Sequence, residues 1–294
     1  MLVLALPGAG ALAARLARLL RCDCSALALH RFPDGETLVR IDAAVAGRCV
    51  VLAGSLDQPD GKTLPLLFAA DAARELGAAQ VGLAAPYLGY MRQDTRFHPG
   101  EAVTSRSYAR LLAASLDFLV TVDPHLHRWR SLDAIYPIRT EAVSAAPRIA
   151  RWLRANVLQP LVVGPDQESE QWVAEVARLT GAPHSVMTKA RHGDREVSVA
   201  LEGAASWPGC TPVLLDDIIS TGNTLVAAAR ALQQAGMAPP LCIGVHALFD
   251  AAAMAQLQQA GVTAVVTCDT VPHASNGIGV VGLVARAVSR LAQR

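Results

Sequence analysis

The stretch "VLLDDIISTGNTL" (Val213–Leu225) joins an apolar strand to a polar loop and the start of a helix. Three branched apolar residues precede two adjacent aspartates, Asp216 and Asp217, and an Ala-rich helical pattern follows the loop. Strand, loop and helix in this order form the repeating unit of α/β proteins with parallel sheets. The stretch therefore bears on both the fold and a ligand site.

The polar loop after the aspartates suits an anion. Backbone N–H groups at a helix N-terminus favour negative charge, and glycine lets the backbone approach a ligand or adopt a positive φ. Two carboxylates beside a phosphate repel it unless they face sugar hydroxyls or a divalent cation. We therefore interpret the stretch as a site for a phosphorylated sugar, with the sugar at Asp216 and Asp217 and the phosphate at the phosphate loop, which comprises Ser220, Thr221, Gly222, Asn223 and Thr224.

A plainer interpretation is that Asp217 or Ser220 only caps the helix. Capping uses one such residue, whereas the sequence has an array of two acids, three hydroxyl residues and a glycine. The array therefore favours the ligand site over the cap.

Short apolar segments alternate with helical patterns along the rest of the chain, which indicates parallel sheets covered on both faces. A break near Thr140–Ser144 separates two halves of similar size, each large enough for its own core. We expect an α/β protein with tandem domains at 1–141 and 142–278, each a mainly parallel sheet flanked by helices. The predicted strands are Leu2–Leu6, Cys49–Ala53, Val81–Pro86, Phe118–Asp123, Pro160–Asp166, Pro212–Asp217, Leu241–Leu248 and Ala264–Asp269.

The composition excludes several classes of protein. The 294 residues are 52% hydrophobic and 17% charged, which suits a folded core and argues against disorder. A net charge of +1 gives no general basic field for nucleic acid. No uninterrupted apolar stretch could span a membrane, and the first twenty residues lack the basic segment of a signal peptide. Six scattered cysteines indicate thiols in a reducing compartment, so we expect a cytoplasmic protein.

Candidate functional residues follow several of the predicted strands. Asp123 and His125 follow one strand, Asp166 another, and the two aspartates of the opening stretch a third. Open α/β sheets bind ligands along the edge where the carboxyl ends of their strands meet. We expect the ligand site at that edge.

The opening stretch resembles the loop that binds 5-phosphoribosyl diphosphate (PRPP) in type I phosphoribosyltransferases and in PRPP synthetases. Further segments, which occur in order between Arg31 and Pro272, resemble only the PRPP synthetases, also called ribose-phosphate diphosphokinases. These segments are "RFPDGE" (Arg31–Glu36), "PYLGYMRQDTRF" (Pro86–Phe97, the RQD segment), "TVDPHLHRW" (Thr121–Trp129) and "MTKARHGDREV" (Met187–Val197).

The resemblance implies an ATP site shared between subunits, and hence a homo-oligomer that is at least a dimer. Phe32 would pack on the adenine of a neighbouring subunit's ATP, with Asp34 and Glu36 at the polar edge of the ring. In isolation, the same segment also fits a Pro-Asp-Gly turn that leads into a strand. The resemblance also implies ATP contacts from the RQD segment, namely from Arg92, Gln93 and Arg96.

The resemblance further implies Mg²⁺ as cofactor, bound by His125 and Asp166 on two sides of the active site. Lys189 and Arg191 would belong to a catalytic loop that closes over the transferred phosphoryl group. In the phosphate loop and at Asp216 and Asp217, the implied ligand is ribose 5-phosphate. The implied fold is two phosphoribosyltransferase-like domains, with a last helix at 279–294 packing back on the first.

We therefore expect a ribose-phosphate diphosphokinase that converts MgATP and ribose 5-phosphate to PRPP and AMP. A PRPP-consuming phosphoribosyltransferase shares the phosphate loop but needs neither the RFPDGE nor the RQD segment. A non-catalytic homologue that binds synthetases or nucleotides is the other alternative, to which three departures from the family pattern point. These departures are Thr95, Pro124 and Gln167–Glu168.

Overall fold

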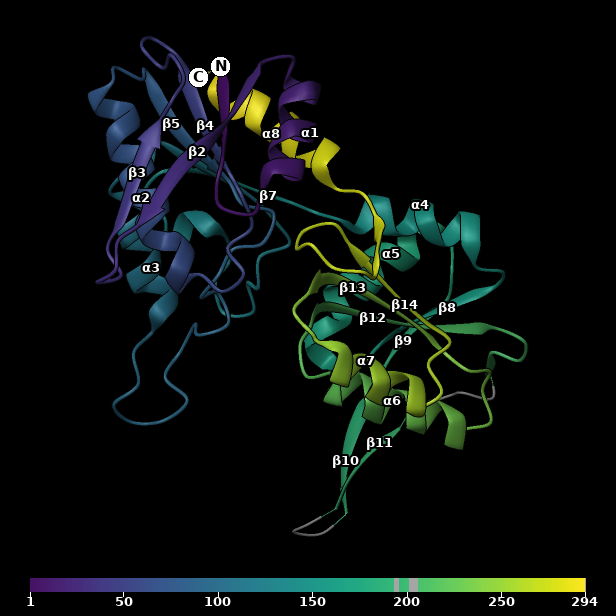
Figure 1. Ribbon diagram of the computed structural model, residues 1–294. Helices are drawn as coiled ribbons and strands as arrows, with labels where there is room; N and C mark the ends of the chain where they lie inside the picture. Colours follow the sequence, from purple (N-terminus) through teal and green to yellow (C-terminus); the bar gives the residue numbers. More distant parts are fainter. Residues whose placement is uncertain (193–195, 201–205, 294) are drawn as a thin grey trace. The chain divides into compact units, whose positions relative to one another are not determined.

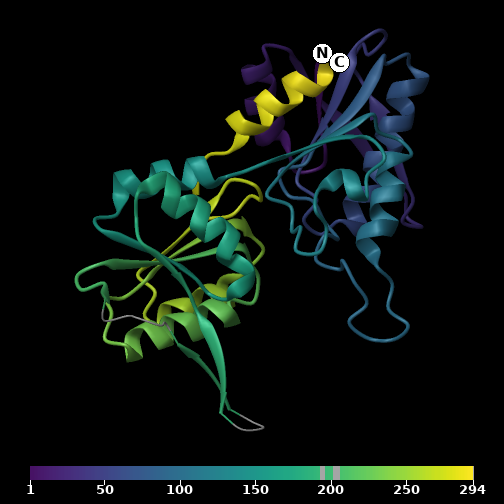
Figure 2. The ribbon, with the colours of Figure 1, turned by 180° about the vertical axis from the view of Figure 1, so that it is seen from behind.

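The computed structural model describes residues 1–192, 196–200 and 206–293, and the side chains of 189–192 and 196–200 lie outside the described part. The chain divides into two compact units. Unit 1 contains Met1–Val143 together with Val280–Arg294, and unit 2 contains Ser144–Gly279. The chain therefore leaves unit 1, builds unit 2 and returns, so that both of its ends lie close together in unit 1 (Figures 1 and 2).

Unit 1 contains a seven-stranded sheet in the order β3-β2-β1-β4-β5-β6-β7. All neighbouring strands are parallel except β2 and β3, which form an antiparallel hairpin at one edge. The strands are β1 (Leu2–Ala5), β2 (Asp23–Arg31), β3 (Thr37–Ile41), β4 (Cys49–Ala53), β5 (Gln80–Ala84), β6 (Phe118–Val122) and β7 (Arg139–Val143).

Helices cover both faces of this sheet. Buried residues of α2 and α3, such as Leu66 and Leu112, share one core with Leu4 and Leu52 of the sheet, while α1 and α8 lie side by side on the other face (Figure 1). Two faces of apolar side chains explain why the central strands are continuous apolar segments. The helices are α1 (Gly10–Leu20), α2 (Asp60–Glu75), α3 (Thr104–Ala113) and α8 (Val281–Ala292), with a 3₁₀ turn at Leu132–Ala134.

The last helix, α8, joins unit 1 through both apolar and polar contacts. Its buried residues recur every three or four positions and form one apolar face. At its C-terminal end, Arg139 of β7 donates a hydrogen bond to the carbonyl of Leu291 at 2.7 Å. Arg290 also forms an ion pair with Glu141 of β7. These contacts fix the end of the chain to the last strand of the unit 1 sheet.

Unit 2 contains a six-stranded parallel sheet in the order β15-β14-β13-β12-β8-β9 and a separate antiparallel pair, β10-β11. The strands are β8 (Pro160–Gly164), β9 (His184–Val186), β10 (Thr188–His192), β11 (Glu196–Ala200), β12 (Thr211–Ile219), β13 (Leu241–Ala247), β14 (Ala264–Cys268) and β15 (Asn276–Ile278). Helices α6 and α7 pack on one face and α4 and α5 on the other (Figure 1). The helices are α4 (Ala146–Asn156), α5 (Glu170–Thr180), α6 (Asn223–Gln234) and α7 (Ala251–Gln259), with a 3₁₀ turn at Gln167–Ser169.

The predicted fold class is confirmed: both units are mainly parallel sheets flanked by helices. The break expected near Thr140–Ser144 contains the boundary between the two units, which falls between Val143 and Ser144, directly after β7. This edge strand, "RTEAV", is only half-buried and polar, so it lacks the apolar pattern of the central strands. None of the helices in the described residues is long and apolar enough to cross a membrane.

The packing of Gly82 against Phe118 gives a test of the unit 1 core. In Gly82→Ala, the added Cβ would lie 2.0 Å from the Phe118 ring, which is fully buried. Overpacking of this kind costs about 1–3 kcal/mol, and each kcal/mol lowers Tm by roughly 2–4 °C in a domain of this size. Scanning calorimetry should show this decrease.

Gly61→Ala in α2 is the matched control. No atom lies within 4 Å of the Cβ that this substitution adds, and alanine is the better helix former. We expect its Tm to stay unchanged or to rise slightly. Equal losses in the two variants would contradict the packing argument.

Candidate functional site

The two aspartates of the opening stretch lie inside β12, near its carboxyl end. The sequence placed the end of this strand at Asp217, but β12 continues to Ile219 because β13 continues to pair with it. On its other side, β12 pairs with β8 up to Leu214. This double pairing brings the end of β8 beside the two aspartates.

Three carboxylates, which we call the carboxylate cluster, meet at this edge: Asp166, Asp216 and Asp217. Asp217 is 5% exposed, and its backbone N–H donates to Oδ1 of Asp216 at 3.0 Å. Burial, followed by the charges of Asp217 and Asp166, raises the pKa of Asp216 well above that of an ordinary carboxyl. The cluster therefore favours a ligand that donates hydrogen bonds or carries positive charge.

Asp166 follows β8 and is oriented by its own turn. Its side chain accepts a hydrogen bond from the backbone N–H of Glu168 at 3.1 Å, and its carbonyl accepts one from the hydroxyl of Ser169 at 2.5 Å. Asp166 thus caps the 3₁₀ turn that precedes α5. Gln167 and Glu168, the departure from the family pattern, are exposed in this turn.

The phosphate loop connects β12 to α6. Gly222 has φ 75° and occupies the N-cap position of α6, so the cap residue itself has no side chain to accept a hydrogen bond. Neither Asp217 nor Ser220 therefore occupies the N-cap position of this helix. By contrast, α7 is capped by Asp250, which accepts from Ala253 N–H at 2.9 Å.

An uncapped helix start leaves backbone N–H groups without partners inside the helix. At α6 these groups belong to the first turn, beside the exposed side chains of Thr221, Asn223 and Thr224. Ser220 is half-buried at the end of β12. The loop can therefore offer backbone and hydroxyl donors to an anion, next to the carboxylate cluster.

In unit 1, the RQD segment forms a folded loop before α3. Arg92 is exposed, whereas the side-chain amide of Gln93 donates to the Glu101 carboxylate at 3.4 Å. Nε of Arg96 donates to the carbonyl of Glu101 at 2.9 Å. Glu101 therefore organises this loop through both its side chain and its backbone.

The RFPDGE segment forms the turn of the β2–β3 hairpin. Phe32 N–H donates to the carbonyl of Glu36 at 2.8 Å, Gly35 has φ 93°, and Asp34 accepts from Glu36 N–H at 3.0 Å. The Phe32 ring is 39% exposed and packs edge-on against His30. The turn expected from Pro-Asp-Gly is present, and it displays an aromatic ring and two exposed acids, Asp34 and Glu36.

The structure places the other predicted residues in separate parts of the chain. His125 follows β6 of unit 1, is half-buried, and packs its ring against His127 with centroids 3.8 Å apart. Lys189 and Arg191 belong to β10, opposite Val199 and Val197 of β11, and their side chains lie outside the described residues. In unit 1, among the described residues, no hydrogen bond or ring contact joins Phe32 to Arg92.

Two sequence profiles cover most of the chain. Residues 1–115 match the N-terminal domain of ribose phosphate pyrophosphokinase, and residues 130–282 match the phosphoribosyl transferase domain. The chain belongs to the ribose-phosphate pyrophosphokinase family. The resemblance found in the separate motifs is thereby confirmed over the whole chain.

Curated relatives agree with this assignment. The ribose-phosphate pyrophosphokinase of Methanopyrus kandleri is 36% identical over 99% of this chain and 99% of its own. That of Methanothermobacter thermautotrophicus is 33% identical over 93% of this chain and 95% of its own. A crystal structure of phosphoribosylpyrophosphate synthetase from Mycobacterium smegmatis has the same fold, with a TM-score of 0.87 over 99% of this chain and 98% of that one, at 22% identity.

The structure adds residues that sequence reasoning did not assign. The hydroxyl of Tyr90 donates to the carboxylate of Asp60, and Tyr108 shares a hydrogen bond with Thr63. Lys62 forms an ion pair with Asp57 at 2.7 Å. No sequence pattern indicated the two tyrosine contacts, because each of them joins residues that are distant in the chain.

The raised pKa of Asp216 predicts how stability changes with pH. The unfolded chain loses this proton near the ordinary pKa of 3.8, whereas the folded chain retains it to higher pH. Stability therefore falls as pH rises between these two pKa values, and the full penalty is present above the raised one. Asp216→Asn should raise the Tm of the ligand-free protein at pH 8, and this gain should shrink as pH falls toward 4.

Each kcal/mol gained in the free energy of unfolding should raise Tm by roughly 2–4 °C. Thermal unfolding between pH 4 and pH 8 can resolve such a shift. Glu168→Gln, which neutralises an exposed carboxylate in the neighbouring turn, is the control and should show no such trend. A difference between Asp216→Asn and wild type that is independent of pH would contradict the electrostatic assignment.

Proposed function

We propose that the protein transfers the diphosphate group of MgATP to ribose 5-phosphate, giving PRPP and AMP. The observation that carries this proposal is the full-length match to ribose-phosphate pyrophosphokinases. The oxygen of the C1 hydroxyl bonds to the β-phosphorus, and the bond from that phosphorus to the oxygen of the α-phosphate breaks. AMP leaves with this oxygen, and the hydroxyl proton is released.

In the proposed complex, unit 2 binds ribose 5-phosphate. The phosphate accepts hydrogen bonds from the first turn of α6, whose N-cap residue is glycine, and from the phosphate-loop hydroxyls. Asp216 and Asp217 accept hydrogen bonds from ribose hydroxyls. Such bonds would offset the burial and repulsion that raise the pKa of Asp216.

Mg²⁺ is the proposed cofactor, with His125 and Asp166 as the residues that hold it. The carboxylate cluster fits an ion that prefers oxygen ligands, since the charges of Asp217 and Asp166 disfavour ionisation of Asp216 in the protein alone. A histidine contact through a retained water suits the same ion. When bound, Mg²⁺ neutralises charge on the polyphosphate.

Unit 1 binds ATP in this proposal. Exposed Arg92 stacks on adenine, with Gln93 beside it and Arg96 toward the polyphosphate. The Phe32 turn, with Asp34 and Glu36, reaches the adenine of a neighbouring subunit, so the active form is a homo-oligomer. Lys189 and Arg191 stabilise the transferred group, and the six cysteines, all free thiols, fit the proposed cytoplasmic location.

An assay of AMP release tests the reaction. ATP and ribose 5-phosphate alone, without a nucleobase, should give AMP and PRPP in equal amounts, measured by chromatography. A phosphoribosyltransferase would require PRPP and a base, and a non-catalytic homologue would release no AMP. Lys189→Ala should lower kcat by about 10²–10³-fold with little change in the Kd for ribose 5-phosphate.

Arg178→Ala, which removes an exposed positive charge from α5, is the control for Lys189→Ala and should keep wild-type turnover. Normal turnover in Lys189→Ala would contradict the role of Lys189. Absence of AMP with the wild-type protein would contradict the proposed reaction itself.

Sharing of the ATP site between subunits predicts complementation. Phe32→Ala and Lys189→Ala should each be nearly inactive alone, but co-expressed mixed dimers contain one site with both residues intact. A random dimer population should then recover roughly 25% of wild-type activity, since half of the dimers have one complete site. Absence of recovery in mixed dimers, or a fully active monomer in sedimentation, would contradict the shared site.

A further inference from the structure

Tyr90 has a strained backbone in the middle of the RQD segment. Its φ is 63°, in the left-handed region that bulky side chains rarely occupy. Such a conformation persists only where the surroundings impose it, and it is concentrated at functional sites. The contacts of Tyr90 therefore identify what maintains this turn.

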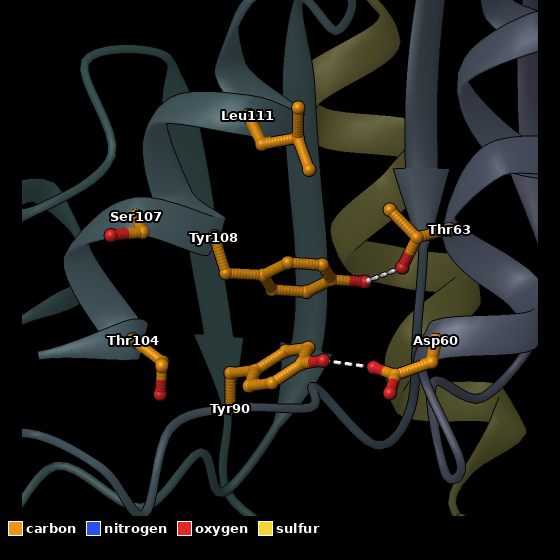
Figure 3. A pocket seen from close by; sticks show the side chains of 7 residues that line it. All are labelled: Asp60, Thr63, Tyr90, Thr104, Ser107, Tyr108 and Leu111. Carbon is orange, nitrogen blue, oxygen red and sulfur yellow. Dashed lines mark hydrogen bonds between the residues drawn. The ribbon is translucent and has the colours of Figure 1, made fainter. Parts of the chain in front are cut away.

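Two helices hold the Tyr90 side chain (Figure 3). Its hydroxyl donates to the carboxylate of Asp60, the first residue of α2. Its ring packs against Tyr108 of α3, with centroids 4.7 Å apart. The Tyr108 hydroxyl in turn bonds to Thr63 of α2 at 3.0 Å, and Tyr108 is buried. The ring of Tyr90 is thus fixed by a hydrogen bond on one side and a buried aromatic ring on the other.

The backbone beside Tyr90 is held just as closely. Tyr87 accepts a hydrogen bond from Leu56 N–H at 2.8 Å. A Cβ on Gly89 would lie 2.7 Å from the Leu56 carbonyl oxygen, so the segment passes against the loop that leads into α2. Lys62 closes that loop through the Ser55 carbonyl at 3.0 Å and Asp57. The support beneath Tyr90 therefore does not depend on Tyr90 itself.

Arg92 lies on the turn that begins at Tyr90. The Tyr90 carbonyl accepts from Gln93 N–H at 3.4 Å, and the Gln93 carbonyl accepts from Ser105 N–H of α3 at 3.2 Å. Only Met91 and exposed Arg92 stand between these two anchored residues. The direction of Arg92 is consequently set by the turn at Tyr90.

We propose that Tyr90, locked by Asp60, is a positioning residue that presets Arg92 for the nucleotide. This inference rests on the proposed role of Arg92 in ATP binding. Tyr90 does not touch the nucleotide; it acts by keeping the strained turn in the conformation that presents the guanidinium. The locked turn lowers the conformational cost of ATP binding.

A cavity next to Tyr90 explains why the lock is needed. It has a volume of about 410 Å³ and is bounded by Thr104, Ser107 and Leu111 of α3 beside the two tyrosine rings. Without the hydrogen bond to Asp60, the Tyr90 ring has room to move into this space. The Tyr90 backbone would then no longer be held at its strained φ and would relax. Packing alone therefore does not fix the turn.

The test compares Tyr90→Phe and Asp60→Ala, which remove the two ends of the hydrogen bond, with their double variant. The Kd for ATP, measured by calorimetry, should rise roughly 3–10-fold in each single variant, the scale of one ordinary hydrogen bond. The double variant should match the single variants, because both remove the same interaction. Asp60→Asn retains an acceptor for the tyrosine hydroxyl and should recover much of the affinity.

The KM for ribose 5-phosphate and kcat at saturating ATP should stay near wild-type values. Ser107→Ala, on the opposite wall of the cavity, is the matched control and should leave the Kd for ATP unchanged. A lower Tm with unchanged ATP affinity would show a purely structural role and overturn the inference. Additive effects of the two substitutions on the Kd for ATP in the double variant would also overturn it. A wild-type protein that binds ATP but releases no AMP would instead contradict the proposed reaction, because ATP affinity is measured separately from turnover.

Discussion

The pairing of β12 with β8 on one side and β13 on the other is the constraint on which the unit 2 site depends. Parallel pairing aligns the carboxyl ends of strands at one edge, whatever follows them. It therefore brings Asp166 beside Asp216 although the two are far apart in sequence. The raised pKa of Asp216 is the electrostatic consequence of a main-chain register. The apolar strands supply the burial energy that offsets this local repulsion.

The start of α6 lies at the same edge, and its N-cap residue is glycine rather than a side chain that could cap the helix. The chain caps the neighbouring helix α7 with Asp250, so the means of capping was available to it. At α6 it instead places glycine with a positive φ before the helix and two acids upstream. Acceptors for hydroxyls and donors for an anion thus lie on the two sides of one turn. A phosphorylated sugar has both kinds of group, whereas a simple anion has only one.

Sequence reasoning recovered the features that depend on local pattern. Apolar strands such as Val81–Pro86 and the turn at Pro33-Asp34-Gly35 were predictable, because burial on two faces and turn chemistry leave direct traces in composition. The polar edge strand β7 left no such trace and was not among the predicted strands. Tyr90 was visible only as part of a motif, since its positive φ and its bond to Asp60 arise from tertiary packing. Local rules fail where distant contacts impose the conformation.

The path of the chain links the two parts of the proposed site in folding as well as in catalysis. Unit 1 needs α8, whose apolar face covers the sheet and whose end is fixed by Arg139 and Glu141. The residues of α8 follow all of unit 2 in the sequence, so during synthesis the core of unit 1 stays open until unit 2 has been made. An apolar sheet face exposed in that interval promotes misfolding. The sheet carrying the proposed ATP-binding segments is therefore completed only in a chain that already contains the phosphate loop.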